Sequence, residues 1–329
     1  MEVTVLGAGS WGTTIAGLLS DRHRALLWAR DPEVAEEVNE RHTNHRYLFD
    51  AALPPVLEAT ADLAEAAARA EVLIVAVPSA GFRVVVEKAA PAVAPGTPLV
   101  SLTKGIETGS LLRMTEVLTE LLPGHPVAAL TGPNLAGEIV SGHPAAGVLA
   151  AERLEVAELL REVIGHRLLR LYVNHDLTGC ELGGSLKNVV AIAVGVAQGL
   201  GAGANACAAV MTRGLAEITR LSVAMGAHPA TLAGLAGMGD LVATCMSPLS
   251  RNRSVGEQLG RGLFLDDILA DMHMVAEGVA TAGVALQLAR RHGVAVPMCA
   301  DIELVLRGDV HAREAQSLQL RPGLEADPG

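Results

Sequence analysis

The feature that most constrains this chain is a glycine pattern directly after its first apolar run. Gly7-Ala8-Gly9-Ser10-Trp11-Gly12 fits G-x-G-x-x-G and precedes a helical stretch carrying Ile15 and Leu19. In this context Gly7 permits a tight turn, Gly9 lets a pyrophosphate approach the backbone, and Gly12 lets the helix pack closely on the strand. The helix N-terminus would face the anion with its N–H groups and dipole. The pattern predicts a dinucleotide-binding unit.

The first half of the chain alternates apolar runs with helical stretches, which favours a parallel sheet covered on both faces. From about Cys180 onward, long Ala, Leu and Val stretches at helical spacing take over. We therefore predict an α/β fold, with a Rossmann-type, doubly wound, mostly parallel sheet over 1–179, an all-α domain over 180–320, and a disordered tail over 321–329. Strands are expected at Val3–Leu6, Ala25–Trp28, Val72–Val77, Leu99–Leu102, Val127–Leu130, Ala145–Leu149 and Leu168–Tyr172.

Composition excludes several classes of protein. The net charge of 25 − 36 = −11 argues against a nucleic-acid partner, which requires a basic face. Mean hydropathy is +0.36, but Gln198 interrupts the most apolar window, Val189–Ala197, so we expect a buried helix and no membrane span. Met1 to Val5 have no basic region, so we expect no signal peptide, and the wide spacing of the four cysteines predicts no metal site. We expect reduced thiols and a cytoplasmic protein.

The end of the second strand indicates which dinucleotide is preferred. Arg30 stands there, 30 − 7 = 23 residues after the first glycine of the loop, where an acidic residue would accept from the ribose 2′-OH of NAD. An arginine can instead hold the 2′-phosphate of NADP. We therefore expect NADPH or NADH as cofactor with NADPH preferred, although the neighbouring Asp31 can still serve NADH.

Lysine usage singles out one helix. The chain has three lysines, Lys88, Lys104 and Lys187, and 25 − 3 = 22 arginines, so each lysine is a candidate for a task that arginine cannot perform, such as releasing a proton. Gly183 and Gly184 lie on the same helix face as Lys187, and a ligand or a closely packed helix must need the room they leave. Apolar neighbours predict that Lys187 is half-buried.

A half-buried lysine suits proton transfer. Burial disfavours its charged form, and a dehydrogenase needs a group that protonates the alkoxide as hydride reaches a carbonyl. Lys187 can fill this role. Asn188 can orient the lysine or the substrate, and Asp240, in a glycine-rich stretch, is a candidate charged partner or a simple helix cap.

The densest basic and polar cluster is Ser250-Arg251-Asn252-Arg253-Ser254. Arginine forks fit phosphate oxygens, with Ser and Asn adding short hydrogen bonds, so the cluster predicts an anion clamp; an exposed surface turn is the alternative. Lys104, at the C-terminal end of a strand, adds a second positive group where open α/β sheets bind ligands. Glu277 can pair with an arginine here or bind the cofactor.

Taken in order, these motifs resemble the bacterial NAD(P)-dependent glycerol-3-phosphate dehydrogenase family from Met1 to about Leu320. The likeness also includes Thr103-Lys104-Gly105, Gly132-Pro133-Asn134-Leu135-Ala136-Gly137-Glu138, Ala236 to Leu241 and Thr212 to Glu217. The resemblance implies reversible reduction of dihydroxyacetone phosphate to sn-glycerol 3-phosphate, a backbone precursor of phospholipids. A homodimer acting on a small phosphorylated three-carbon substrate is expected.

The resemblance also assigns residues. It makes Lys187 the proton donor and acceptor, and the substrate would contact Lys104, Gly132, Asn134, Lys187, Asp240, Ser250, Arg251 and Asn252. The cofactor would contact Gly7, Gly9, Ser10, Trp11, Gly12, Arg30, Lys104, Ala136, Arg251, Val275 and Glu277.

Two departures from the family pattern concern these assignments. Asn134-Leu135 replaces the usual Ser or Thr followed by Phe, so a substrate contact at this position requires the amide to replace a hydroxyl. Phe49 stands where a proline is common. A 3-hydroxyacid or 6-phosphogluconate type dehydrogenase is an alternative, as is a non-catalytic NAD(P)-sensing protein, which would need neither the lysine nor the clamp.

Overall fold

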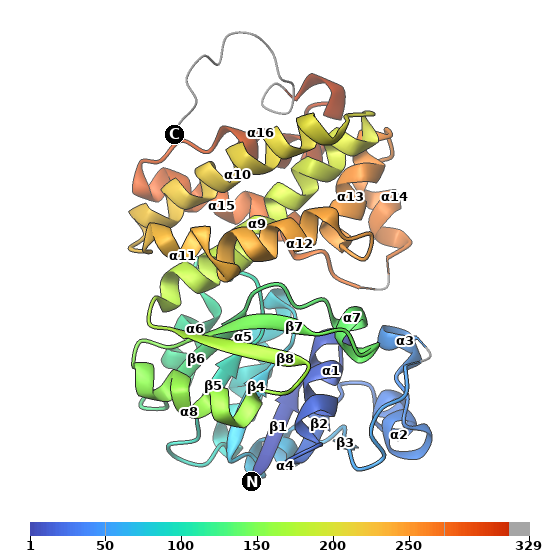
Figure 1. The fold of residues 1–329 in the computed structure, drawn as a ribbon, viewed down its shortest axis with the longest axis vertical. Coiled ribbons are helices and arrows are strands. Elements are labelled where there is room, and N and C mark those ends of the chain that lie inside the picture. Colours follow the sequence, from blue (N-terminus) through green and yellow to red (C-terminus); the bar gives the residue numbers. More distant parts are fainter. Residues whose placement is uncertain (50, 273, 316–329) are drawn as a thin grey trace. The chain divides into compact units, whose positions relative to one another are not determined.

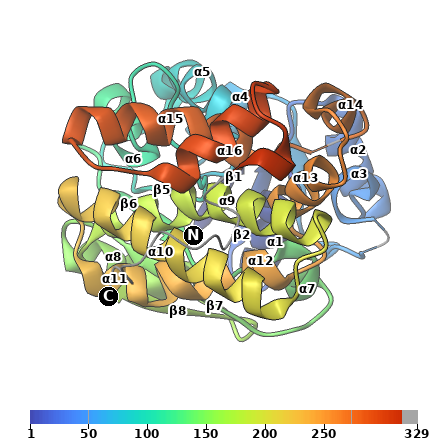
Figure 2. The same ribbon diagram turned by 90° about the horizontal axis from the view of Figure 1, so that it is seen from above.

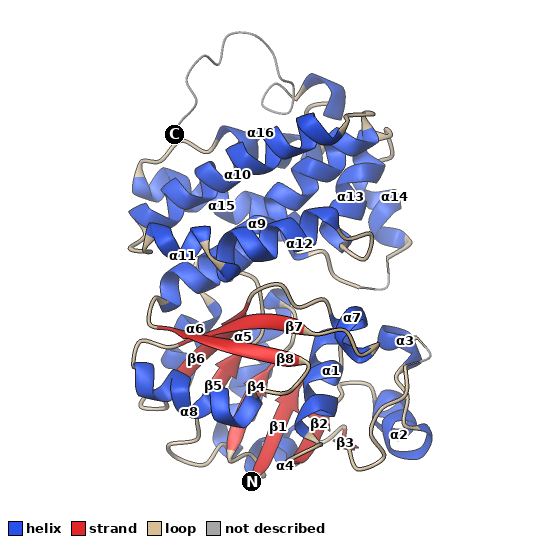
Figure 3. Ribbon diagram, in the orientation of Figure 1, coloured by secondary structure: helices blue, strands red, loops and turns tan. Residues whose placement is uncertain are grey.

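The structure, a computed structural model, describes residues 1–49, 51–272 and 274–315. The chain divides into two compact units. The first consists of Met1–Lys104 and Leu112–Leu177, and the second of Gly105–Leu111 and the chain from Thr178 onward. Figure 3 shows that the first unit holds the sheet and the second is built from helices. The predicted tail, 321–329, lies outside the described residues.

The sheet of the first unit has eight strands, in the order β3-β2-β1-β4-β5-β6-β7-β8. They are β1 (Glu2–Leu6), β2 (Arg24–Trp28), β3 (Glu58–Thr60), β4 (Val72–Val75), β5 (Leu99–Ser101), β6 (Val127–Thr131), β7 (Ala145–Ala150) and β8 (Leu169–Asn174). All seven expected strands are present, but β3 was missed. Its three residues, Glu-Ala-Thr, have no apolar run, and pairing with β2 alone defines the strand.

The strand pairing is parallel except between β6 and β7, which confirms the mostly parallel prediction. The first six strands follow the order 3-2-1-4-5-6 of a dinucleotide-binding fold, whose direction reverses between β1 and β4. Leu6 is in register with both Trp28 and Val75, so the carboxyl ends of the three strands lie side by side. A ligand is expected outside this edge.

Helices cover both faces of this sheet (Figure 1). Alternate strand residues separate two apolar clusters: Val3 and Val5 share one with α1, α2 and α8, whereas Leu6 shares the other with α4, α5 and α6. The helices of this unit are α1 (Ser10–Leu19), α2 (Pro32–Arg41), α3 (His45–Leu48), α4 (Leu63–Ala68), α5 (Ser79–Ala89), η1 (Ala90–Ala92), α6 (Met114–Leu121), α7 (Ala136–Val140) and α8 (Leu154–Ile164).

The second unit is organised around one long helix. Figure 2 shows α9 (Leu177–Gly199) lying between α10 (Ala204–Ala224) and the pair α15 (Glu277–His292) and α16 (Pro297–Arg307). The remaining helices are α11 (Pro229–Ala233), the π-helix η2 (Leu235–Gly239), α12 (Asp240–Met246), α13 (Arg251–Gly260), α14 (Leu265–Ala270) and η3 (Ala312–Glu314).

Glycines let α9 and α13 approach backbone to backbone. An added Cβ would lie 2.1 Å from the Arg253 carbonyl oxygen at Gly195, and 2.0 Å from the Ile192 carbonyl oxygen at Gly256. The same closeness recurs one turn later at Gly199 and Gly260. This pairing of small residues at four-residue spacing fixes α13 against α9, although the sequence analysis did not identify it.

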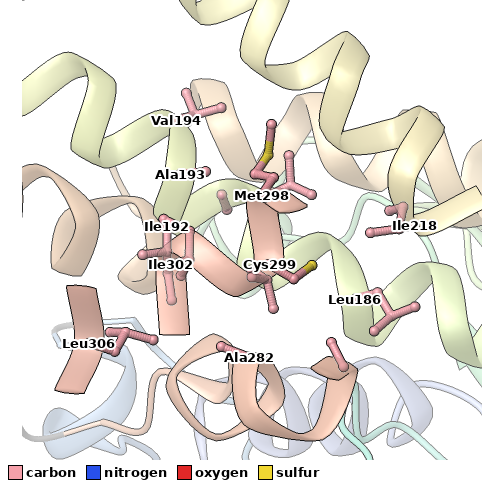
Figure 4. Packing of buried hydrophobic residues seen from close by; sticks show 14 of the residues in the cluster. Leu186, Ile192, Ala193, Val194, Ile218, Ala282, Met298, Cys299, Ile302 and Leu306 are labelled. Carbon is pink, nitrogen blue, oxygen red and sulfur yellow. The ribbon is translucent and has the colours of Figure 1, made fainter. Parts of the chain in front are cut away.

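The core of the second unit is aliphatic. Leu186, Ile192 and Val194 of α9 pack with Ile218, Ala282 and Met298 from three other helices (Figure 4). The α9 helix is long and apolar enough to cross a membrane by length and composition, but its most apolar window is wholly buried inside the protein. The prediction that Val189–Ala197 forms a buried helix is confirmed. All four cysteines are free and buried.

Candidate active site

The glycine-rich loop has the predicted geometry. Gly7 has a φ of 116°, and an added Cβ would lie 2.8 Å from the Ala76 carbonyl oxygen; at Gly12 it would lie 1.9 Å from the Gly7 carbonyl oxygen. At Gly9 nothing lies within 4 Å of an added Cβ. The first and third glycines are thus required by packing, whereas the second leaves an open face at the N-terminus of α1.

A neighbouring loop holds this turn in place. Asn44, which is fully buried, donates from Nδ2 to the Ala8 carbonyl oxygen and to Thr13 Oγ1, both at 2.9 Å. The Ser10 hydroxyl donates to the Tyr47 carbonyl oxygen at 2.8 Å. Asn44 was not predicted from the sequence, because its hydrogen bond to the glycine-rich loop spans 36 residues and no local pattern indicates it.

The same loop contains the predicted departure at Phe49. This residue is 74% exposed and has a φ of 52°, in the left-handed region. A proline ring holds φ near −65°, so proline cannot adopt this backbone conformation. The loop therefore follows a path that depends on the residue present in this chain.

At the end of β2, Arg30 and Asp31 differ in whether their side chains are already engaged by other residues. Asp31 caps α2 by accepting from the Glu33 N–H at 3.2 Å, and it pairs with Arg46 at 3.2 Å. Arg30 is exposed and makes no hydrogen bond or ion pair within the described residues. The acidic residue is thus engaged, whereas the arginine remains available to an anion.

Lys104 and Asn134 meet where β5 and β6 end. Lys104 Nζ donates to the Gly132 carbonyl oxygen at 2.8 Å and to Asn134 Oδ1 at 2.7 Å. Because an ammonium only donates, it fixes which end of the amide faces it. Asn134 is 9% exposed, and its Nδ2 is buried with no hydrogen-bond partner among the described residues. The amide therefore presents an unused donor.

In the second unit, Lys187 is more deeply buried than predicted. It is 4% exposed, and its ammonium lies 3.0 Å from Asp240 Oδ1, which is 2% exposed, so the predicted charged partner is confirmed. The ammonium also donates to Thr244 Oγ1, whose hydroxyl donates at 2.7 Å to the Asp240 carbonyl oxygen. Thr244 was missed, although its position four residues after Asp240 places both on one helix face.

The room left by Gly183 is filled by protein. An added Cβ there would lie 2.9 Å from the Ala236 carbonyl oxygen of η2. Of the two explanations left open, a closely packed neighbour is the correct one for this glycine. The π-helix next to Asp240 is a geometry that is frequent at functional sites.

An amide network joins the lysine helix to the clamp. Asn252 Nδ2 donates to Asn188 Oδ1 at 2.9 Å, and Asn252 Oδ1 accepts from the Gly278 N–H at 2.9 Å. Gly278 has no room for a Cβ, which would lie 2.7 Å from the Asn188 carbonyl oxygen. The starts of α13 and α15 are thereby fixed to the turn of α9 that follows Lys187.

The predicted clamp divides into two kinds of residue. Ser250 caps α13, and Arg253 is bound internally by the Ser247 carbonyl oxygen, Gln198 and Glu257, so its guanidinium holds the fold. Arg251 is exposed and donates to the Val275 carbonyl oxygen at 2.7 Å. Of the two arginines, Arg251 is therefore the one that can reach a ligand.

The two units share the predicted site residues between them. The first unit carries Gly7, Gly9, Ser10, Trp11, Gly12, Arg30, Lys104, Gly132, Asn134 and Ala136, and the second carries Lys187, Asp240, Ser250, Arg251, Asn252, Val275 and Glu277. Within the first, contacts join Lys104 to Gly132 and Asn134; within the second, they join Lys187 to Asp240, and Arg251 to Val275. The described ranges contain no group of three His, Cys, Asp or Glu side chains that could hold a metal ion.

A dinucleotide-binding sheet and a helical unit with a buried lysine–carboxylate pair define a two-domain nicotinamide-dependent dehydrogenase. Two family models match the chain, the NAD-dependent glycerol-3-phosphate dehydrogenase N-terminus over residues 2–157 and the corresponding C-terminus over 176–317. The chain belongs to this family. Membership decides against the 3-hydroxyacid, 6-phosphogluconate and non-catalytic alternatives.

Individual relatives agree with this assignment. A protein of Sphingopyxis alaskensis named glycerol-3-phosphate dehydrogenase (NAD(P)+) 2 is 53% identical, with 100% of this chain and 99% of the relative covered. One from Thermobifida fusca named glycerol-3-phosphate dehydrogenase (NAD(P)+) is 50% identical over 90% of each chain. The crystal structure of glycerol-3-phosphate dehydrogenase from Coxiella burnetii superposes with a TM-score of 0.93 at 35% identity, covering 97% and 99% of the two chains.

Proposed function

We propose that this protein catalyses the reversible NAD(P)H-dependent reduction of dihydroxyacetone phosphate to sn-glycerol 3-phosphate and so supplies the backbone of glycerophospholipids. Family membership over both units supports the reaction. Among this chain's own residues, the buried ion pair of Lys187 and Asp240 is the observation that best supports this reaction. An ammonium kept from water beside one carboxylate suits proton exchange with a substrate oxygen.

The glycine-rich loop fits a dinucleotide. The open face at Gly9 and the unpaired Arg30 suit its phosphates, and the buried indole nitrogen of Trp11 has no partner among the described residues. When bound, the nicotinamide supplies the hydride that adds to the substrate carbonyl. The other proposed cofactor contacts are Gly7, Ser10, Gly12, Lys104, Ala136, Arg251, Val275 and Glu277.

Lys187 is the proposed proton donor in the reduction and acceptor in the oxidation. Asp240 and Thr244 hold the ammonium in one position, which removes the need to order it during the reaction. The positive charge also stabilises negative charge as it develops on the carbonyl oxygen.

Asn134 is the proposed substrate contact of the first unit. Because Lys104 binds its oxygen, Asn134 can offer only its Nδ2 hydrogens, and it therefore donates to a substrate oxygen in place of the hydroxyl usual in the family. Lys104 and the Gly132 backbone complete this contact region.

The phosphate of the substrate is proposed to bind at the start of α13. Arg251 offers a guanidinium there, Ser250 a hydroxyl, and Asn252 the amide hydrogen that its bond to Asn188 leaves over. Their placement beside Lys187 depends on the glycine contacts between α9 and α13.

Consumption of reduced cofactor tests this reaction directly. Nicotinamide absorbance should fall with dihydroxyacetone phosphate and change little with unphosphorylated dihydroxyacetone or with 3-oxoacids. The Arg251→Ala enzyme should show a raised KM for the phosphorylated ketone, and its low rate with dihydroxyacetone should be unchanged. Equal rates with the two ketones in the wild type would refute the phosphate clamp.

Preference for NADPH over NADH rests on Arg30. Asp31 already caps α2 and pairs with Arg46, so the ribose 2′-OH of NADH would have to compete for it, whereas Arg30 is available to a 2′-phosphate. Replacing Arg30 by Ala should raise KM for NADPH by about tenfold or more, as expected for one lost charge-assisted hydrogen bond, and leave KM for NADH nearly unchanged. An equal rise for both cofactors would show that Arg30 does not discriminate.

We also propose a homodimer in the cytoplasm. The four free thiols agree with a reducing compartment. Light scattering on the purified protein measures the mass in solution, and a value of 34.0 kDa, that of one chain, would exclude the dimer.

A further inference from the structure

A hollow of about 660 Å³ lies in the first unit, away from the glycine-rich loop. It is lined by the turn between α1 and β2, by the last part of α8, by the turn that follows α8 and by the first residues of β8. The glycine-rich loop precedes α1 and the hollow follows it, and a helix of 10 residues is about 15 Å long. The hollow is therefore separate from the proposed pyrophosphate site.

Two of the lining residues build its wall. Arg22 donates to the carbonyl oxygens of Glu162 at 3.3 Å and Val163 at 3.1 Å, and to that of Gly165, so it satisfies the last carbonyls of α8. His166 Nδ1 accepts from the Leu168 N–H at 3.2 Å, which leaves Nε2 to bond Asp21 at 2.9 Å. These contacts hold the two turns in fixed positions.

Three further arginines in the lining have no acidic partner. Arg161, Arg167 and Arg170 are exposed, and their guanidinium groups make no hydrogen bond or ion pair within the described residues. The Arg170 guanidinium lies over the Tyr172 ring at 5.4 Å. Other arginines of this unit, such as Arg69, pair with carboxylates.

The hollow is therefore positive in an acidic protein. Its four arginines face two acids, Asp21 and Glu162, giving a balance of 4 − 2 = +2, whereas the chain as a whole carries −11. Gathering like charges is unfavourable unless an anion compensates them. Leu169 and Leu171 add apolar lining.

We propose that this hollow binds a small polyanion with two or more linked phosphate groups. Arginine forks recognise phosphate oxygens in pairs, and several unpaired guanidiniums suit several phosphates better than one. A volume of about 660 Å³ lies within the usual range for small-molecule sites. The site does not depend on the proposed reaction, since it uses none of the residues assigned to it.

Calorimetric titration of the full-length protein with inorganic tripolyphosphate tests the proposal, with NADPH present at saturation to occupy the cofactor site. We expect saturable binding of one tripolyphosphate per chain, and orthophosphate binding at least tenfold weaker. The double variant Arg161→Gln/Arg170→Gln should weaken tripolyphosphate binding by at least tenfold, as expected for the loss of charge-assisted contacts.

The matched control is Arg41→Gln/Arg291→Gln, which removes two exposed guanidinium groups that likewise make no hydrogen bond or ion pair within the described residues. Its affinity for tripolyphosphate should stay within twofold of the wild type. No saturable binding, loss of binding in the presence of NADPH, or equal weakening in both double variants would each overturn the proposal. Binding to vesicles containing anionic phospholipid but not to tripolyphosphate would also overturn it.

Discussion

Replacing Lys187 by Met separates proton transfer from the structural role of the buried ion pair. Methionine keeps most of the volume of the side chain but can neither donate a proton nor pair with Asp240. Proton transfer by a positioned side chain typically contributes about 10²- to 10⁴-fold to the rate, so kcat should fall by a factor in this range. Cofactor affinity should be retained, because Lys187 is not among the proposed cofactor contacts.

The same change should destabilise the second unit. At 3.0 Å, with an effective dielectric constant of about 20, the attraction between the charges is about 5.5 kcal/mol, and desolvation offsets part of it. Removing one partner leaves Asp240 buried and uncompensated, which typically lowers the free energy of unfolding by about 3–5 kcal/mol. The double variant Lys187→Met/Asp240→Leu removes both charges and should recover most of this loss while remaining inactive.

Steady-state kinetics and urea unfolding of the wild type, both single variants and the double variant complete the cycle. Cofactor binding, followed by nicotinamide fluorescence, provides the folding control. Near-wild-type turnover in Lys187→Met would refute the proton-transfer role. If the stability losses of the two single variants simply add in the double variant, the carboxylate and the ammonium do not act as a pair.

Three further predictions concern other parts of the molecule. Asn134→Asp should raise KM for dihydroxyacetone phosphate by about tenfold or more, because a carboxylate beside Lys104 has no hydrogen to donate to the substrate. Asn134→Ser, which restores a hydroxyl donor, should have a lower KM than Asn134→Asp. Equal KM values in the wild type and the Asp variant would contradict the proposed contact. Burial raises the pKa of Glu217, so the folded state holds the carboxyl proton to higher pH than the unfolded state does. Between the ordinary and the raised pKa, the free energy of unfolding of the wild type should therefore fall, relative to that of Glu217→Gln, as pH increases. Urea unfolding measures this difference, and a difference that stays constant across the range would refute the prediction. Gly256→Ala should lower the free energy of unfolding by about 1–3 kcal/mol and raise KM for the phosphorylated substrate, because the new Cβ would lie 2.0 Å from a carbonyl oxygen of α9. The control is Gly81→Ala in α5, where an added Cβ meets open space; it should gain up to about 1 kcal/mol and keep KM unchanged, and a stability loss equal to that of Gly256→Ala would contradict the reasoning.

Local patterns predicted the parts of the fold that depend on neighbouring residues. The apolar runs indicated seven of the eight strands, and the glycine pattern indicated both the tight turn at Gly7 and the close packing at Gly12. The exception, β3, is defined by its pairing with β2 and has no apolar run of its own. Periodicity detects burial along an element, and it cannot detect a strand that exists through its neighbour alone.

The sequence predicted which residues belong to the candidate site better than it predicted the contacts between them. The scarcity of lysine and the glycine spacing on one helix singled out Lys187. The glycine-rich stretch singled out Asp240, either as a charged partner of this lysine or as a helix cap. The distance of 3.0 Å between them spans 53 residues of chain, 240 − 187, and no local pattern encodes it. The sequence analysis also did not reveal that Arg253 is bound internally whereas Arg251 is available.

Functional groups that lie within one turn or one helix can thus be predicted from the sequence, because residues a few positions apart share a helix face or a loop. The sequence determined that this chain carries a glycine-rich loop between a strand and a helix, a lysine within an apolar helix and a basic cluster. Only the tertiary structure decided the orientation of the Asn134 amide, the burial of Lys187 against Asp240 and the fixing of the α13 helix on α9. Each of these depends on side-chain or backbone atoms that the fold brings together from distant segments, where a single carbonyl or ammonium determines which hydrogen bonds remain available.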